Sequence, residues 1–209
     1  MSNSVIAGEG GQVSAEEVAS LIGRRCSSAD YSGKKVLVIV PDSTRTAPVG
    51  MVFKALYDQV GSVVDRIDIM IALGTHQPMS EEAICERIEI TTEERSGRYK
   101  DVGFYNHEWD NPDALREIGV ITKDQLDELT EGRFAMDIPV EINRRLYDYD
   151  QIVILGPVFP HEVVGFSGGN KNLFPGVSGP KLLNFFQWLA AVITNPKIIG
   201  HKWTAVRKV

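Results

Sequence analysis

The stretch that decides the fold is KKVLVIVPDSTRTAPVGMVFKALYDQV, residues 34–60. It opens on a β-branched apolar run with the length of a buried strand (34–40), and a segment rich in turn residues follows at once (41–50). The apolar residues of VFKALYDQV (52–60) then recur at helical spacing. The stretch therefore predicts a strand, a loop and a helix, in that order.

The same unit recurs further along the chain. IDIMIAL (67–73) is a second apolar run of strand length, and EEAICERI (81–88) is suited to a helix. Ser80 can cap this helix, and the acidic residues of its first turn favour it. Strands that alternate with helices are typical of a parallel sheet with right-handed crossovers.

The remaining elements are one weak strand, one strong strand and one buried helix. DVGFYNHEWDNP (101–112) is the weak strand and ends in a turn, whereas QIVILGPVF (151–159) is a strong strand. PKLLNFFQWLAAVI (180–193) predicts a buried helix with proline in its first turn. Residues 97–149 are more polar, and beyond the weak strand only a short helix is predicted there, at 123–129. We therefore predict an α/β fold with an open, mostly parallel, Rossmann-like sheet and helices on both faces.

Composition limits the classes of function. The 209 residues are 43% hydrophobic and 24% charged, which is enough for a packed core that can host an enzyme. The net charge of -6, with no run of basic residues, argues against a nucleic-acid surface, and no apolar run is long enough for a membrane span. Cys26 and Cys85 form neither a disulfide framework nor a zinc motif. We expect a cytoplasmic protein that acts on a small molecule, and a homo-oligomer is compatible with the sequence.

Chemically reactive side chains follow the predicted strands. Asp42 and Arg45 come just after the first strand, His76 after the second, and His107 at the end of the weak strand. His161 comes just after the last strand. In open α/β sheets, ligands bind beyond the carboxyl ends of the strands, so these side chains are expected on one rim.

A glycine-rich segment, HEVVGFSGGNKNLFPG (161–176), carries a single lysine, Lys171. It is not a Walker A loop, because Asn170 and Asn172 stand where that motif needs glycine and a hydroxyl residue. The backbone of GFSGG can still cradle a phosphate or carboxylate. The residues predicted to form this cradle are Ser167, Gly168 and Gly169. Lys171 would be either a point charge on that anion or a nucleophile of lowered pKa.

The segment DSTRTAP (42–48) indicates a second anion site on the same rim. Asp42 can hold a ribose hydroxyl, Thr44 offers its own hydroxyl, and Arg45 is a planar fork for phosphate or carboxylate. Two such sites together indicate a nucleotide-like ligand beside an acidic substrate.

Four motifs, DSTRTAP, GTHQP, NHEWDNP and HEVVGFSGGNKNLFPG, stand in this order, and together they resemble the amino-terminal domain of the nickel-dependent lactate racemase family. The resemblance implies a nickel-pincer nucleotide, a pyridinium mononucleotide tethered covalently to Lys171. It also implies that Asp42 and Arg45 hold this nucleotide. His76 and His161 would be two proton acceptors on a 2-hydroxy acid while hydride moves to the cofactor and back, and imidazoles have a pKa suited to that task.

The chain departs from the family pattern in two ways. Sixteen residues after the lysine, the family has a histidine that binds nickel, whereas this chain has Gln187, and an amide is a poor nickel ligand. The family's carboxy-terminal α/β domain is also not in this chain. We expect residues 1–33 to form an amino-terminal extension with a short helix, and residues 34–209 to form the racemase-like domain.

The predicted function is that of a racemase or epimerase domain for a small 2-hydroxy acid. The alternative is a metal-free module that binds a nucleotide or anion and has lost catalysis. A third reading is a nucleotide-dependent transferase in which Arg45 and Lys171 contact phosphates.

Overall fold

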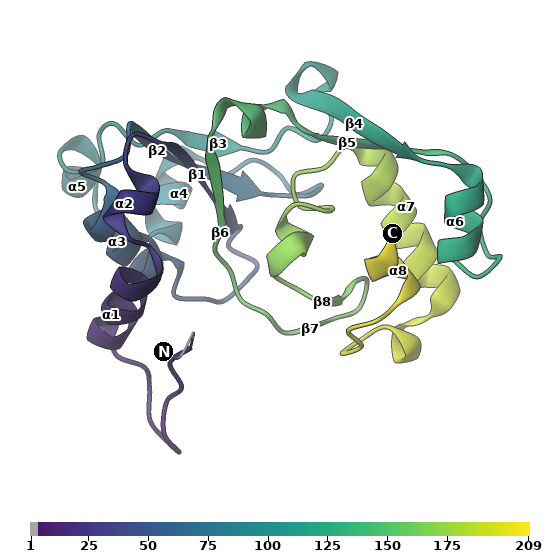
Figure 1. The fold of residues 1–209 in the computed structure, drawn as a ribbon, viewed down its shortest axis with the longest axis horizontal. Helices are drawn as coiled ribbons and strands as arrows, with labels where there is room; N and C mark the ends of the chain where they lie inside the picture. The colour runs from purple at the N-terminus through teal and green to yellow at the C-terminus, as the bar shows by residue number, and fades with distance from the viewer. Residues whose placement is uncertain (1–3) are drawn as a thin grey trace.

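The computed structural model describes residues 4–209 and contains a four-stranded parallel sheet (Figure 1). The strand order is β3-β2-β1-β6, and every neighbouring pair is parallel. These strands are β1 (Lys35–Pro41), β2 (Arg66–Ala72), β3 (Phe104–Asn106) and β6 (Gln151–Ile154). The open parallel α/β sheet predicted from the sequence is confirmed.

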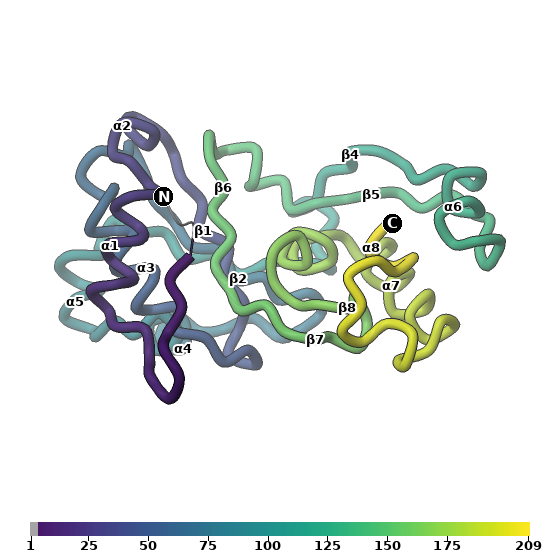
Figure 2. Tube along the Cα trace, turned by 60° about the horizontal axis from the view of Figure 1, so that its bottom comes forward, coloured from purple at the N-terminus to yellow at the C-terminus, as the bar shows by residue number. Residues whose placement is uncertain are grey.

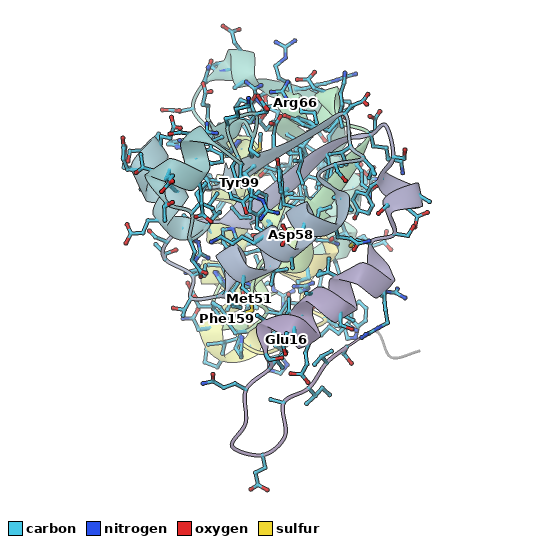
Figure 3. The ribbon with its side chains drawn as sticks, turned by 90° about the vertical axis from the view of Figure 1, so that its left-hand side faces the viewer. Glu16, Met51, Asp58, Arg66, Tyr99 and Phe159 are labelled. Carbon is cyan, nitrogen blue, oxygen red and sulfur yellow. The ribbon has the colours of Figure 1, made fainter. Side chains whose placement is uncertain are left out.

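One face of the sheet is covered by α-helices. They are α1 (Ala15–Arg25), α2 (Ser28–Tyr31), α3 (Val49–Val60), α4 (Glu81–Arg87) and α5 (Thr92–Ser96). The core on this side contains alternate residues of β1 and β2, such as Val38 and Ile69, packed with Phe53 of α3. Figure 3 looks onto this side, where α1, marked by Glu16, lies across α3, marked by Asp58. Successive side chains of each strand point to opposite faces of the sheet, and on this face they pack against the apolar sides of the amphipathic helices.

The opposite face of the sheet is covered by 3₁₀ helices and loops. Leu37, Ile39 and Met70 pack there against Ile142 and Val177. The covering segments include η2 (Arg144–Asp148) and η3 (Gly169–Asn172). The glycine-rich segment predicted to bind a ligand therefore packs directly on the sheet.

An antiparallel hairpin occupies the region predicted to hold only a short helix. It consists of β4 (Leu115–Ile121) and β5 (Ile138–Asn143), with α6 (Lys123–Leu129) between them at the predicted position. Residues 116–120 of β4 are all exposed, so the strand lacks the apolar alternation that would have shown it in the sequence. A short 3₁₀ helix, η1 (Pro112–Ala114), precedes it. The two strands run from the sheet towards α6 and pass over α7 (Figure 1).

The last third of the chain forms a second core around α7 (Pro180–Ile193). Its residues Leu182, Phe185 and Leu189 pack with Leu126 of α6. The end of the chain adds η4 (Asn195–Lys197) and α8 (Ala205–Lys208). Figures 1 and 2 show two short paired strands, β7 (Pro160–His161) and β8 (Gly165–Phe166), between the sheet and this second core.

Two further features correct or complete the sequence prediction. The strand predicted at 151–159 ends at Ile154, because Gly156 and Pro157 follow and proline cannot donate to a sheet ladder. Among residues 4–209, no helix is long and apolar enough to cross a membrane.

Candidate functional site

A cleft lies at the carboxyl edge of the sheet, where the chain leaves β1, β2 and β6. It is lined by Asp42, Thr44, Arg45, His76, His161, Ser167, Gly168, Lys171 and Gln187, among others. Strand β1 has β2 on one side and β6 on the other, so the segments that follow β1 and β6 diverge and leave a crevice between them. The structure thus brings together every residue of the predicted catalytic and cofactor-binding set except Gly169, which is exposed and does not line the cleft.

Asp42 and His76 form a pair on one wall of the cleft. The buried Asp42 accepts a hydrogen bond from the backbone N–H of Thr44 through Oδ1 (3.1 Å), and its Oδ2 contacts His76 Nδ1. Burial by itself would raise the pKa of Asp42, but the hydrogen bonds from Thr44 and His76 outweigh it and lower the pKa. Asp42 is therefore ionised at neutral pH, and His76 donates from Nδ1. This tautomer leaves Nε2 of His76 free to accept a proton.

His161 lies in the opposite electrostatic environment. Its Nδ1 accepts a hydrogen bond from the backbone N–H of Val163 (3.0 Å), and its Nε2 lies 3.4 Å from Nη2 of Arg45. Burial, together with the positive charges of Lys171 and Arg45, lowers the pKa of His161 to about 4, against a smaller opposing effect of Glu162. His161 is therefore uncharged at neutral pH, and a new positive charge on it would be costly.

Lys171 is partly buried and forms no salt bridge with any residue that the structure describes. Its backbone N–H bonds to the carbonyl of Gly168 (3.1 Å), which holds η3 in place. Within residues 4–209 its ammonium group makes neither a hydrogen bond nor an ion pair. Burial and the charge of Arg45 lower the pKa of Lys171, which increases the fraction of free, nucleophilic amine.

The glycine-rich segment shapes the loop more than it offers a cradle. Gly168 has φ +71, and a Cβ there would lie 2.4 Å from the carbonyl oxygen of Pro157, so the chain itself requires glycine. The hydroxyl of Ser167 donates to the same carbonyl (3.1 Å) and accepts from the N–H of Phe159 (3.1 Å). Ser167 was predicted to cradle an anion through its backbone N–H, but that N–H donates to the carbonyl oxygen of Phe159 (2.8 Å), so it closes the loop as the hydroxyl does. Gly169 has φ +53, but a Cβ added there would meet no atom within 4 Å. Only the backbone conformation therefore favours glycine at this position.

His107 does not reach the cleft, so the prediction that it lies on the rim is wrong. It is buried, with Nε2 bonded to the carbonyl of Ser178 (3.0 Å) and Nδ1 bonded to the amide of Asn143 (3.1 Å). Burial lowers its pKa, so it is a neutral structural histidine that joins β3 to the segment before α7. Nothing in the local sequence distinguishes it from His76, because both follow a strand.

Gln187 lies on α7 with an exposed side chain that lines the cleft. In the part of the chain that the structure describes, no group of three or more His, Cys, Asp or Glu side chains could hold a metal ion. The cleft thus offers imidazoles only at His76 and His161, and both already have hydrogen-bond partners.

The fold and the cleft define an α/β domain with a polar cleft at the carboxyl edge of its sheet, and this cleft carries two histidines and one lysine. The chain belongs to the family described as the lactate racemase N-terminal domain, whose model matches residues 16–186. It is 24% identical over 147 residues to a lactate racemase of Thermoanaerobacterium thermosaccharolyticum, a match that covers 69% of this chain and 30% of that protein.

Solved structures agree with this assignment. A crystal structure of a protein from Thermotoga maritima matches with a TM-score of 0.85 and 32% identity, over 98% of this chain and 47% of that one. The lactate racemase apoprotein of Thermoanaerobacterium thermosaccharolyticum has the same fold, with a TM-score of 0.60 and 22% identity, over 82% of this chain and 39% of that one. The chain therefore spans less than half the length of these relatives.

Proposed function

We propose that this domain carries the cofactor anchor and the proton-transferring groups of a racemase or epimerase for a small 2-hydroxy acid. The observation that carries the proposal is the juxtaposition in one cleft of two histidines and a lysine that forms no salt bridge among residues 4–209. Arg45 and Lys171 form no salt bridge among residues 4–209 and can contact an anionic ligand, and a 2-hydroxy acid and a mononucleotide are both anionic.

The residues fit the nucleotide part of the cofactor that the family implies. Lys171 has the lowered pKa and the unpaired amine that covalent attachment requires, and Arg45 has no carboxylate partner within residues 4–209. When bound, such a cofactor would supply the hydride acceptor that racemisation through a ketone needs. The residues do not fit nickel equally well, because the side chain at 187 is an amide, and we derive no step through the metal.

The two histidines would have unequal tasks. Nε2 of His76 is free to accept the proton of the substrate hydroxyl, and Asp42 would stabilise the imidazolium that forms. His161 has cations beside it and stays neutral, so it becomes a useful base only when the surrounding positive charge is reduced. A bound carboxylate, or the conversion of the Lys171 amine to an uncharged linkage, would reduce that charge.

The test separates anchoring from catalysis. Protein is produced together with the cofactor-synthesis enzymes, and its intact mass is measured. Lys171→Ala should lose the cofactor adduct, His76→Ala should keep the adduct but lose racemisation, and Lys181→Ala, on the exposed side of α7, should do neither. A full adduct on Lys171→Ala protein would show that the anchor lies elsewhere.

The second candidate is a metal-free module that binds a nucleotide or anion, and Gln187 favours it. If this candidate is correct, purified protein holds no nickel after dialysis and catalyses no racemisation, although it still binds its ligand. Under the racemase proposal, Gln187→His should hold nickel more firmly than the unmodified chain. Equal nickel retention by both forms would show that position 187 is not a ligand position.

A further inference from the structure

The side chain of Asn172 has an unexplained polar group. It is the last residue of η3 and is only 7% exposed. Of the side-chain nitrogen and oxygen atoms in residues 4–209, its amide nitrogen is the one that is fully buried without a hydrogen-bond partner. Buried polar groups are almost always bonded, so such an atom calls for a cause.

Among residues 4–209 no acceptor lies within hydrogen-bonding reach of this amide nitrogen. It lies where the chain leaves β1 and β6, beside Pro41 at the end of β1 and Gly156 just after β6. Nδ2 of Asn172 is 3.4 Å from the point where a Cβ on Gly156 would stand, and ring carbons of Pro41 are 3.2 and 3.4 Å from that same point. An amide held between a proline ring and a glycine is desolvated with no compensating bond. The fold therefore does not gain stability from having asparagine at this position.

The position coincides with the place where a ligand is expected. Asn172 lines the cleft at the crevice between β1 and β6, and Lys171 precedes it directly in the chain. Among the described residues neither Arg45 nor Lys171 forms a salt bridge, so both can contact a negatively charged group of a ligand, although the carboxylates of Asp42 and Glu162 line the same cleft. A charged oxygen is also the acceptor that a bare amide N–H binds most strongly.

We propose that Asn172 is a recognition residue whose side-chain amide, closed to solvent in this structure, turns into the cleft and donates a hydrogen bond to a carboxylate or phosphate oxygen of the ligand. The inference rests on the proposed function only in requiring an anionic ligand. It requires neither nickel nor turnover, so it can fail while the racemase proposal stands, and the reverse is also true.

The test uses protein without cofactor and three probes: inorganic phosphate, lactate and nicotinic acid mononucleotide. Calorimetry gives the Kd of each probe for the unmodified chain, for Asn172→Ala and for the isosteric Asn172→Asp. The matched control is Asn170→Ala, an exposed asparagine of the same 3₁₀ helix that does not line the cleft. Thermal unfolding is followed for all four proteins.

Both Asn172 variants should weaken at least one probe by about tenfold or more, with the control unchanged. The Tm of Asn172→Ala should be unchanged or higher, because no internal hydrogen bond is lost, whereas Asn172→Asp should lower the Tm because it buries a carboxyl group without a partner. Selective weakening of lactate assigns the amide to a carboxylate, and selective weakening of phosphate and the mononucleotide assigns it to a phosphate. Unchanged Kd values in the Asn172 variants, the absence of binding by every probe, or a Tm lowered by several degrees in Asn172→Ala would overturn the proposal.

Discussion

Replacing Lys171 by glutamine should raise the pKa of His161. The two residues line the same cleft, and the positive charge of Lys171 acts together with burial and with Arg45 to keep His161 uncharged. Glutamine removes the charge and keeps a polar side chain of similar length. Lys171→Arg is the matched control, because it retains the charge.

The size of the effect follows from the causes of the shift. The pKa of His161 is lowered from 6.5 to about 4, and burial, the largest cause, persists in the variant. A nearby cation at an effective dielectric constant of about 20 is worth on the order of 1–2 kcal/mol, or roughly one pKa unit. The pKa of His161 should therefore rise by roughly one unit in Lys171→Gln protein and stay near its original value in Lys171→Arg protein.

The assay is an NMR titration of the imidazole signals, assigned with a His161→Gln variant. The reasoning is refuted if the pKa of His161 is the same in the unmodified chain and in Lys171→Gln, or if Lys171→Arg raises it equally. Either result would mean that burial and Arg45 alone hold the imidazole neutral.

The same shift has a consequence for stability. The folded pKa of His161 lies below its unfolded value, so the unfolded chain binds the proton more readily between the two values. The contribution of His161 is fully present above pH 6.5 and is lost as the pH falls to about 4. The loss amounts to about 3 kcal/mol in the free energy of unfolding. Lys171→Gln should reduce this loss, and urea unfolding between pH 4 and pH 7 measures it.

Four further substitutions test structural roles by urea unfolding. Gly165→Ala should lower the free energy of unfolding by at least about 3 kcal/mol, because φ is +82 and a Cβ would lie 2.2 Å from a backbone carbonyl oxygen. Gly169→Ala, where a Cβ would meet open space, should lower it by only about 1 kcal/mol. Equal losses in the two variants would contradict this. Tyr149→Phe removes a hydrogen bond to the fully buried Asp68 and should lower the free energy of unfolding by about 1–3 kcal/mol. Unchanged stability would show that the other hydrogen-bond donors to Asp68 are enough to stabilise its charge. His107→Leu should lower the free energy of unfolding by about 2 kcal/mol, because two buried hydrogen bonds are lost, but it should leave the Kd of phosphate, lactate and the mononucleotide unchanged. Weaker binding would show that His107 contributes to the ligand site.

The sheet could be predicted because its strands are buried on both faces. Strands β1 and β2 are continuous apolar runs, and the polar residues that follow them mark the rim where the cleft lies. The carboxyl ends of parallel strands lie on one edge, so chain order alone placed Asp42 and His76 together. The same reasoning failed for His107, because chain order does not show whether a side chain at the end of a strand points into the cleft or into the protein interior.

The remaining features depend on tertiary contacts that have no local sequence signal. Strand β4 is exposed and pairs with β5 through a bulge near Gly119, so it lacks the pattern of a half-buried strand. Ser167 carries a hydroxyl that could serve a ligand or the loop, and only the structure shows that it serves the loop. Asn172 was informative in the sequence only as a mismatch to a phosphate-binding motif. Its unbonded amide becomes visible only when Pro41 and Gly156 are seen beside it.

The pairing of β1 with β6 also bears on how the molecule is made. Val36 pairs with Gln151, so closing this edge of the sheet joins residues separated by more than half of the chain. Strands β1 to β3 and the helices on their outer face come from the first 106 residues, and they can begin to pack while the rest of the chain is still being synthesised. The cleft needs β6 and the segment after it, and closing so long a loop is slow. Binding competence is therefore acquired late, and a ligand would report on completed folding rather than guide its first steps.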